Sequence, residues 1–274
     1  MGKFDGILIC TDLDGTLLRT DKTISDENVE KIEYFKREGG YFTFITGRLP
    51  YYSTDAYLAV RPNAPYGCVN GGALYDGVRN TYIWRRELGA SAIRLVEHID
   101  ERFPEIGIEL CAFDNTYFAK ESSGTVHHRK KTGLPNIPCN YKRFSEPLGK
   151  ILFCSEDDAL LSSAMEALAS HELSQEFDFI RSERVMLEIL PKGVHKGLAL
   201  RKLAEHLGID IRKTVAVGDY DNDVGMLKAA GVGVAVANSS PAALASADYI
   251  TVSNDEHAIA KVIFDIENGK IKLE

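Results

Sequence analysis

Short apolar runs alternate with amphipathic stretches in the first and last thirds of the chain. The runs are nearly continuous, which is typical of strands buried on both faces of a sheet. Such predicted strands cover residues 6–11, 41–45, 214–217, 232–237 and 249–252. Helical spacing of apolar residues predicts a helix between Ser25 and Gly39, and further helices over 196–206, 223–230 and 258–266. This alternation predicts an α/β fold with a parallel sheet covered by helices on both faces.

The middle of the chain has a different pattern. Strand-like runs follow one another directly there, with helices between pairs, which favours an α+β domain with a mostly antiparallel sheet. The predicted strands cover 106–113, 116–120, 150–154, 177–180 and 185–190, and the predicted helices cover 91–102 and 157–171. Residues 124–147 contain Gly and Pro without a clear period, so we expect an irregular stretch and take it as the candidate substrate-facing loop. We therefore expect an α/β core of residues 1–83 and 191–274, with an inserted α+β domain of residues 84–190.

The net charge of the chain limits the kinds of molecule that we expect it to bind. The 274-residue chain has a net charge of −8 and a pI near 5.5, which argues against nucleic acid or an anionic membrane surface as the partner. The dense basic run His127–Lys131 is expected to be a solvated loop, and the alternative is a patch that attracts an anionic substrate.

The sequence contains no clear signal for membrane insertion or secretion, and no cysteine motif. No stretch approaches the ~18 apolar residues of a membrane span, and the N-terminus does not read as a signal peptide. The five cysteines lack the spacing of a disulfide framework or a zinc site. We expect a cytoplasmic protein that is a monomer or a weak homodimer.

Acidic side chains gather where the predicted strands end. Asp12 and Asp14 follow the first strand, and Asp219 and Asp223 follow the strand over 214–217. Because the carboxyl ends of parallel strands form the ligand-binding edge of such a sheet, we expect these carboxylates to converge. A divalent cation such as Mg²⁺ would relieve their repulsion, since it takes oxygen ligands from carboxylates, water and phosphate.

Carboxylates beside a metal suggest phosphoryl transfer. One aspartate of the pair Asp12 and Asp14 can attack phosphorus and form an aspartyl-phosphate, while the other protonates the leaving oxygen and then deprotonates water. This division needs carboxylates of different protonation, which crowding of the two would provide. Thr46 and Gly47 can hold phosphate oxygens, and Lys196 at a predicted helix start can supply positive charge.

Two further motifs are ambiguous. Arg48, and the run Asn70-Gly71-Gly72, fit ordinary turns as well as they fit a site.

The order of these motifs resembles the haloacid dehalogenase (HAD) superfamily. The four segments that carry the resemblance are Asp12-Leu13-Asp14-Gly15-Thr16-Leu17, Thr46-Gly47-Arg48, Lys196, and Gly218-Asp219-Tyr220-Asp221-Asn222-Asp223. The insertion between the second and third motifs resembles a type C2 cap, and Leu187–Pro191 leading to Gly193–Gly197 resembles the Cof-type (HAD-IIB) subgroup. The resemblance implies a Rossmann-like HAD core with a cap that closes over the site and selects the substrate.

The resemblance also implies a role for each motif residue. Asp12 would be the nucleophile and a Mg²⁺ ligand, and Asp14 would be the general acid/base and bind the metal through its backbone carbonyl. Asp219 would be the third protein ligand, with Asp223 in or near the metal shell. The phosphate would be bound by Thr46, Gly47, Lys196 and Asn222. An aspartate at position 14 suits hydrolysis of a phosphomonoester, and residues 17–24 resemble the flap of the family.

The expected function is therefore a Mg²⁺-dependent phosphatase of small phosphorylated metabolites, such as sugar phosphates. One alternative is a phosphomutase of the phosphomannomutase type, which would return the phosphate to a sugar. Another is a phospho-acceptor switch that resembles a response-regulator receiver, although a receiver is about half as long and has no insertion. The last is a non-catalytic protein that binds phosphorylated ligands, which the complete set of catalytic groups disfavours.

Overall fold

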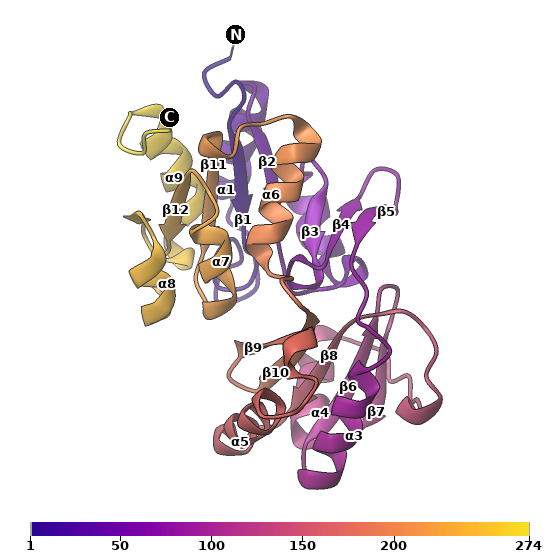
Figure 1. Cartoon of the computed structure of the whole chain (residues 1–274). Helices are drawn as coiled ribbons and strands as arrows, with labels where there is room; N and C mark the ends of the chain where they lie inside the picture. Colours follow the sequence, from indigo (N-terminus) through magenta and orange to yellow (C-terminus); the bar gives the residue numbers. More distant parts are fainter. Residues whose placement is uncertain (1, 274) are drawn as a thin grey trace. The chain divides into compact units, whose positions relative to one another are not determined.

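The computed structural model describes residues 2–273 and divides into two compact units (Figure 1). The first unit runs up to Trp84 and resumes at His195, and the second comprises Arg85–Val194. These boundaries lie one and four residues later in the chain than the sequence pattern places them. The candidate site residues of the sequence analysis all belong to the first unit.

A five-stranded parallel sheet forms the centre of the first unit. Its strands lie in the order β13-β12-β11-β1-β2, and every neighbouring pair is parallel. Their bounds are β1 Leu8–Thr11, β2 Tyr41–Phe44, β11 Thr214–Gly218, β12 Val232–Ala235 and β13 Tyr249–Ile250. All residues of β1 are buried, as expected for a central strand covered on both faces. The predicted α/β fold class is confirmed.

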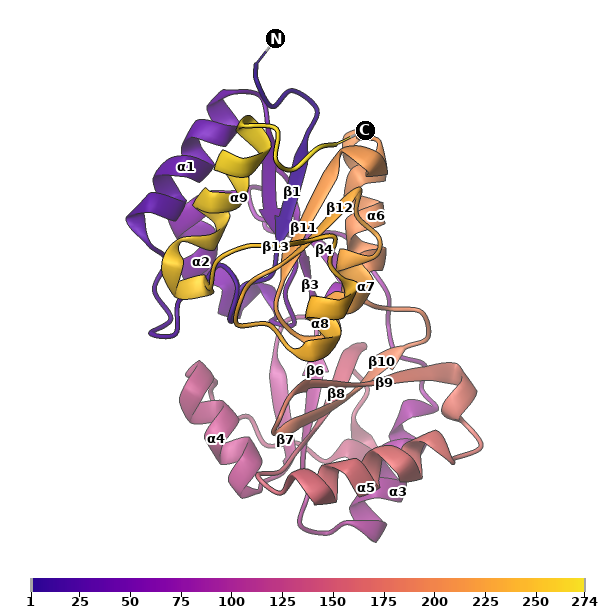
Figure 2. The same cartoon turned by 90° about the vertical axis from the view of Figure 1, so that its left-hand side faces the viewer.

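Helices cover both faces of this sheet (Figure 2). α1 (Asp26–Arg37) and α9 (Ala258–Glu267) lie on one face, and α6 (Lys196–Leu207) and α7 (Val224–Leu227) lie on the other. α1 begins after Ser25, whose side chain accepts a hydrogen bond from the backbone N–H of Asn28, as the N-cap pattern predicts. α7 is shorter than predicted, because a 3₁₀ turn takes up its first residues and turns follow Leu227.

The pattern of apolar residues did not predict some elements of the first unit. A small sheet in the order β3-β4-β5 follows the second strand of the central sheet, and two short helices accompany these strands. The bounds are α2 Thr54–Val60, β3 Tyr66–Cys68, β4 Ala73–Asp76, β5 Thr81–Arg85 and α8 Pro241–Ser246. These elements have three to seven residues, which is too short for a clear hydrophobic period.

The second unit contains a five-stranded antiparallel sheet in the order β7-β6-β8-β10-β9. The strands are β6 Gly107–Ala112, β7 Thr116–Lys120, β8 Leu148–Cys154, β9 Phe177–Glu183 and β10 Met186–Pro191. α3 (Ala92–Arg102) and α5 (Asp158–Ala169) pack against one face and complete an apolar core. The α+β architecture predicted for the insertion agrees with this arrangement.

The stretch predicted to be irregular instead begins with a helix, α4 (Ser123–Thr132). Ser122 and Thr125 form a reciprocal N-terminal cap, and Gly133 ends the helix in a left-handed conformation. The basic run therefore lies on a helix and not in a loop. Within residues 2–273, no helix combines the length and the apolar character needed to cross a membrane.

Candidate active site

The two aspartates after β1 point to different partners. The backbone N–H of Asp12 continues the sheet by donating to the carbonyl of Val217 (2.8 Å), which fixes its position beside β11. The Asp12 carboxylate lies with those of Asp219 and Asp223, with oxygen atoms within 4.8 Å of one another. The Asp14 carboxylate instead binds Arg48. Crowding of carboxylates was expected between Asp12 and Asp14. It occurs instead between Asp12 and the carboxylates of Asp219 and Asp223, which follow β11.

Lys196 lies inside this acidic group. It is the first residue of α6, is 1% exposed, and places its Nζ 2.7 Å from Asp12 Oδ1 and 2.6 Å from Asp223 Oδ1. The other oxygen of Asp223 accepts hydrogen bonds from the backbone N–H groups of Asp219 (3.0 Å) and Tyr220 (3.1 Å). Asp223 thus holds Lys196 and the loop after β11 together.

Gly15 and Thr16 bring Asp219 close to the first strand. The Thr16 hydroxyl donates to Asp219 Oδ1 over 2.8 Å. Gly15 has a φ of +79°, and a Cβ there would lie 2.4 Å from Asp219 Oδ2, so no other residue fits without displacing that carboxylate. The motif glycine therefore has a steric role in the acidic group.

Burial sets the protonation of the acidic group. Burial raises the pKa of Asp12 well above its ordinary value, and the charges of Asp223 and Asp219 add to this while Lys196 opposes it. Burial and the charge of Asp223 raise the pKa of Asp219 to about 7. For Lys196, burial lowers the pKa, but Asp12 and Asp223 outweigh it and the pKa ends above its usual range. Lys196 is thus charged, but its single positive charge does not balance three carboxylates.

The donor set suits a hard divalent cation. Three carboxylates and one ammonium leave a formal charge of −2, and the three acidic residues offer only oxygen atoms. Burial and the neighbouring carboxylates raise the pKa values of Asp12 and Asp219, so a further positive charge would stabilise both as carboxylates. The acidic group Asp12, Asp219 and Asp223 thus fits a metal of the Mg²⁺ kind by charge and by ligand type.

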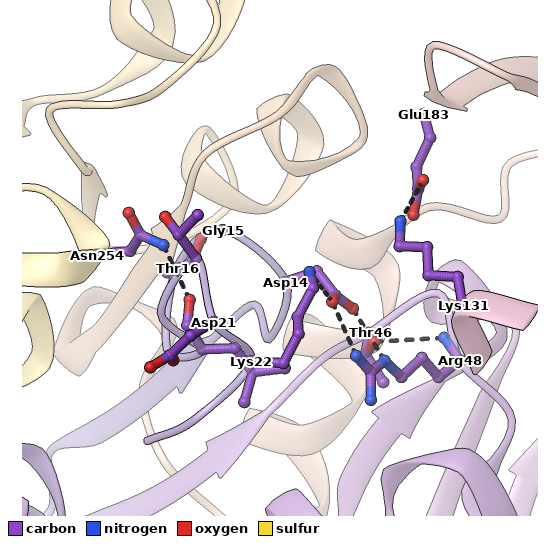
Figure 3. A network of polar contacts seen from close by, with 12 residues as sticks. Asp14, Gly15, Thr16, Asp21, Lys22, Thr46, Arg48, Lys131, Glu183 and Asn254 are labelled. Atoms are coloured by element: carbon purple, nitrogen blue, oxygen red, sulfur yellow. Dashed lines mark hydrogen bonds and ion pairs between the residues drawn. The ribbon is translucent and has the colours of Figure 1, made fainter. Parts of the chain in front are cut away.

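Asp14 is held by two cations (Figure 3). Arg48 binds it bidentately, with Nε 2.8 Å from Oδ2 and Nη2 2.7 Å from Oδ1, and Lys22 Nζ lies 2.9 Å from Oδ1. Burial would raise the pKa of Asp14, but the hydrogen bonds and charge of Arg48, with the charge of Lys22, hold it far below its usual range. Asp14 is therefore a carboxylate here.

The Lys22 contact comes from a tight turn. The backbone N–H of Arg19 donates to the carbonyl of Thr23 (2.8 Å), and Lys22 has a φ of +69°. Asn254 fixes the base of this segment by donating to the carbonyl of Leu18 (3.0 Å). The turn thus presents one lysine to Asp14.

The expected phosphate-binding residues lie on three loops at the same edge of the sheet. Thr46 and Gly47 follow β2, Lys196 begins α6, and Asn222 lies in the 3₁₀ turn after β11. Asn222 donates through Nδ2 to Asn70 Oδ1 (3.1 Å), and the Thr46 hydroxyl accepts from the backbone N–H of Arg48 (3.3 Å).

Sequence reasoning left three participants unassigned: Arg48, Lys22 and Asn70. The signal for Arg48 was present in its place directly after Thr46-Gly47. Asn70 had a comparable signal in the run Asn70-Gly71-Gly72, and Lys22 lies in the segment 17–24 that resembles the flap. The sequence does not define the shapes of these two turns, so it does not predict which groups the two side chains contact.

The basic run is largely paired within its own unit. His128 Nδ1 lies 2.9 Å from Glu109, and Lys131 Nζ lies 2.6 Å from Glu183 (Figure 3). Arg129 also binds a glutamate, Glu121. These pairs weaken the interpretation of the run as a patch of free positive charge.

Comparison with known proteins finds similar sequences and structures among hydrolases. The family described as haloacid dehalogenase-like hydrolase matches residues 9–263 of the chain. A putative phosphatase of Streptococcus pyogenes is 29% identical over 268 residues, covering 93% of this chain and 96% of that protein. A 5-amino-6-(5-phospho-D-ribitylamino)uracil phosphatase of Bacillus subtilis is 28% identical over 256 residues, covering 93% and 94%. The crystal structure of a haloacid dehalogenase-like hydrolase from Bacteroides thetaiotaomicron superposes with a TM-score of 0.83 at 26% identity, covering 95% of this chain and 99% of that one.

Proposed function

Because the chain belongs to the haloacid dehalogenase-like hydrolase family, we propose that it is a Mg²⁺-dependent phosphatase of small phosphorylated metabolites. The reaction would pass through an aspartyl-phosphate on Asp12. One observation carries this proposal: a buried carboxylate at the end of β1 lies beside a buried ammonium and two further carboxylates. The names of two relatives, a putative phosphatase and a phosphatase of a ribitylamino uracil, agree with this proposal.

The metal would be held by Asp12, Asp219 and the backbone carbonyl of Asp14, with Asp223 beside it. Bound there, a divalent cation would supply positive charge that screens the Asp12 carboxylate from an anionic phosphate.

Asp12 performs the first chemical step in this proposal. An Asp12 oxygen forms a bond to phosphorus while the ester P–O bond breaks, and the electron pair of that bond leaves with the alcohol oxygen. The departing oxygen takes a proton from Asp14. Asp14 is bound to Arg48 and Lys22 as a carboxylate in this structure, so it must leave these cations and gain a proton before the step.

Water completes the cycle. Asp14, now a carboxylate, accepts a proton from the attacking water, whose oxygen bonds to phosphorus as the bond to Asp12 breaks. The products are inorganic phosphate and free Asp12, and Asp14 has regained its proton. Rebinding of Asp14 to Arg48 would then release that proton, since Arg48 favours the carboxylate.

We propose that the phosphate is bound by the hydroxyl of Thr46, the backbone of Gly47, the ammonium of Lys196 and the amide of Asn222. Lys196 can contribute because its Nζ already lies 2.7 Å from the attacking carboxylate. We further propose that the inserted unit, Arg85–Val194, selects the leaving group.

The test is phosphate release from p-nitrophenyl phosphate and from a panel of phosphorylated metabolites, with Mg²⁺ and with EDTA. The panel includes sugar phosphates and a phosphorylated ribitylamino pyrimidine, the compound class in the name of one relative. We expect release that needs Mg²⁺ and is abolished in Asp12→Asn and Asp14→Asn. The matched control is Asp55→Asn, because Asp55 is exposed on α2.

Rapid quenching then tests the intermediate. Phosphate should appear covalently on the peptide that contains Asp12 in the wild type and not in Asp12→Asn. Phosphate that returns to a second hydroxyl of a sugar would identify a phosphomutase instead. A folded protein with Mg²⁺ that releases no phosphate from any compound would refute the proposed function.

A further inference from the structure

An unusual backbone segment lies between β3 and β4. Val69, Asn70 and Gly71 have φ values of +55°, +52° and +90°, and residues 2–273 contain no other run of three positive φ angles. A β-branched residue such as valine strongly disfavours this conformation, and such strain persists only where the surroundings fix it. The question is which contacts hold this segment, residues 69–71, in place.

The backbone of the segment is tied to the loop after β2. The N–H of Val69 donates to the carbonyl of Arg48 (3.1 Å), and the N–H of Asn70 donates to the carbonyl of Thr46 (3.0 Å). A Cβ built on Gly47 would lie 3.0 Å from Asn70 Oδ1, so the Asn70 amide packs directly on that glycine.

The segment also packs on the start of α6. A Cβ at Gly71 would lie 2.3 Å from the carbonyl oxygen of His195 and 2.8 Å from the backbone nitrogen of Lys196. Any larger residue would displace the first turn of α6, from which Lys196 reaches the acidic group.

The side chain of Asn70 completes the connection. It is 1% exposed, and its Oδ1 accepts the hydrogen bond from Asn222 Nδ2 over 3.1 Å. This bond uses one N–H of the Asn222 amide and fixes which way the amide faces. Segment 69–71 therefore contacts all three loops that carry the proposed phosphate-binding groups.

We propose that Asn70 is a positioning residue for phosphate binding, which acts by orienting the amide of Asn222 and by packing on Gly47. This inference rests on the proposed function. The left-handed backbone contributes to this positioning, because it directs the buried Asn70 amide toward both Asn222 and Gly47.

The test separates the side chain from the backbone. Asn70→Gly removes the amide but tolerates the left-handed conformation, whereas Asn70→Ala removes the amide and adds backbone strain. We expect Asn70→Gly to keep the melting temperature close to that of the wild type. Its dissociation constant for inorganic phosphate in the presence of Mg²⁺, measured by calorimetry, should rise about tenfold, the effect of losing one hydrogen bond to a charged ligand. KM for p-nitrophenyl phosphate should rise with it.

A double-mutant cycle shows whether Asn70 acts through Asn222. Asn222→Ala alone should also weaken phosphate binding, and the loss in the double variant should be smaller than the sum of the two single losses. Asn70→Ala also removes the amide, so its phosphate affinity is the readout if Asn70→Gly does not fold.

Two outcomes would overturn the inference alone: phosphate binding and KM unchanged in folded Asn70→Gly or Asn70→Ala, or losses that add independently in the double variant. A wild-type protein that neither binds phosphate nor releases it from any substrate would overturn the proposed function, and this inference with it.

Discussion

Replacing Lys196 by methionine tests the charge balance of the acidic group. Methionine keeps the length and apolar stem of lysine but removes the ammonium that contacts both Asp12 and Asp223. Loss of one partner from a buried ion pair costs about 3–5 kcal/mol, because the other partner stays buried without compensation. We expect Lys196→Met to lower the free energy of unfolding of the first unit by this amount at pH 7 in EDTA.

The chain offers a specific probe for this unit. Trp84 is the only tryptophan, and it packs against the apolar core of the first unit. Its fluorescence during a urea titration therefore reports on this unit and not on the inserted one. Lys31→Met is the matched control, since Lys31 forms a surface ion pair with Glu267 at 3.2 Å, a kind of contact that contributes at most about 1 kcal/mol.

Two conditions should reduce the deficit of Lys196→Met. Millimolar Mg²⁺ should restore part of the stability, because it replaces the lost positive charge. Acid should do the same. Burial already raises the pKa of Asp12, and removal of Lys196 raises it further, so the penalty is present at neutral pH and disappears as pH falls below about 4, the ordinary range of an aspartate. A variant within about 1 kcal/mol of the wild type at pH 7 in EDTA would refute this electrostatic reasoning.

Further predictions concern the same edge of the sheet. Gly15→Ala should weaken Mg²⁺ binding at least about tenfold in calorimetry, because its Cβ would displace Asp219. Gly6→Ala has a similar φ (+77°) and open space around it, so it should lose about 1–2 kcal/mol to backbone strain and keep its Mg²⁺ affinity; equal losses of affinity would contradict the steric argument. Arg48→Met should raise the pKa of Asp14. Because Asp14 gives its proton to the leaving oxygen, the alkaline limb of the pH–rate profile should move to higher pH, and an unmoved limb would show that Arg48 does not hold Asp14.

The parallel core and its acidic edge could be predicted from the sequence because their signals are local. Nearly continuous apolar runs define β1 and β11, and the side chains that directly follow a central strand lie at its carboxyl end. This is why Asp12 and Asp219 could be expected at the same edge of the sheet.

The direction of the Asp14 side chain was not predictable in the same way. It depends on Arg48 and Lys22, which reach it from a loop and a turn whose shapes depend on the whole fold. The strain at Val69 is a similar case, since Asn70-Gly71-Gly72 indicates a turn but a valine gives no sign of a left-handed backbone at its own position.

The helix α4 was missed for a different physical reason. Its sequence, SGTVHHRKKT, has no apolar stripe, so it gives no helical period. The helix is held by caps at both ends, by a hydrogen bond between His128 and Glu109 and by an ion pair between Lys131 and Glu183, both of which join it to strands distant in the sequence. Such stabilisation becomes visible only once the fold is known.

The order of the strands has a consequence for the newly made chain on the ribosome. β1 emerges early, but its neighbour β11 begins only at residue 214, after all 110 residues of the inserted unit (85–194) have been synthesised. Every strand of the inserted sheet lies within residues 107–191, so this sheet can form before β11 is available to pair with β1. Asp12 therefore joins Lys196, Asp219 and Asp223 only late in translation, so the carboxylates can assemble only after the whole unit inserted between them has been synthesised.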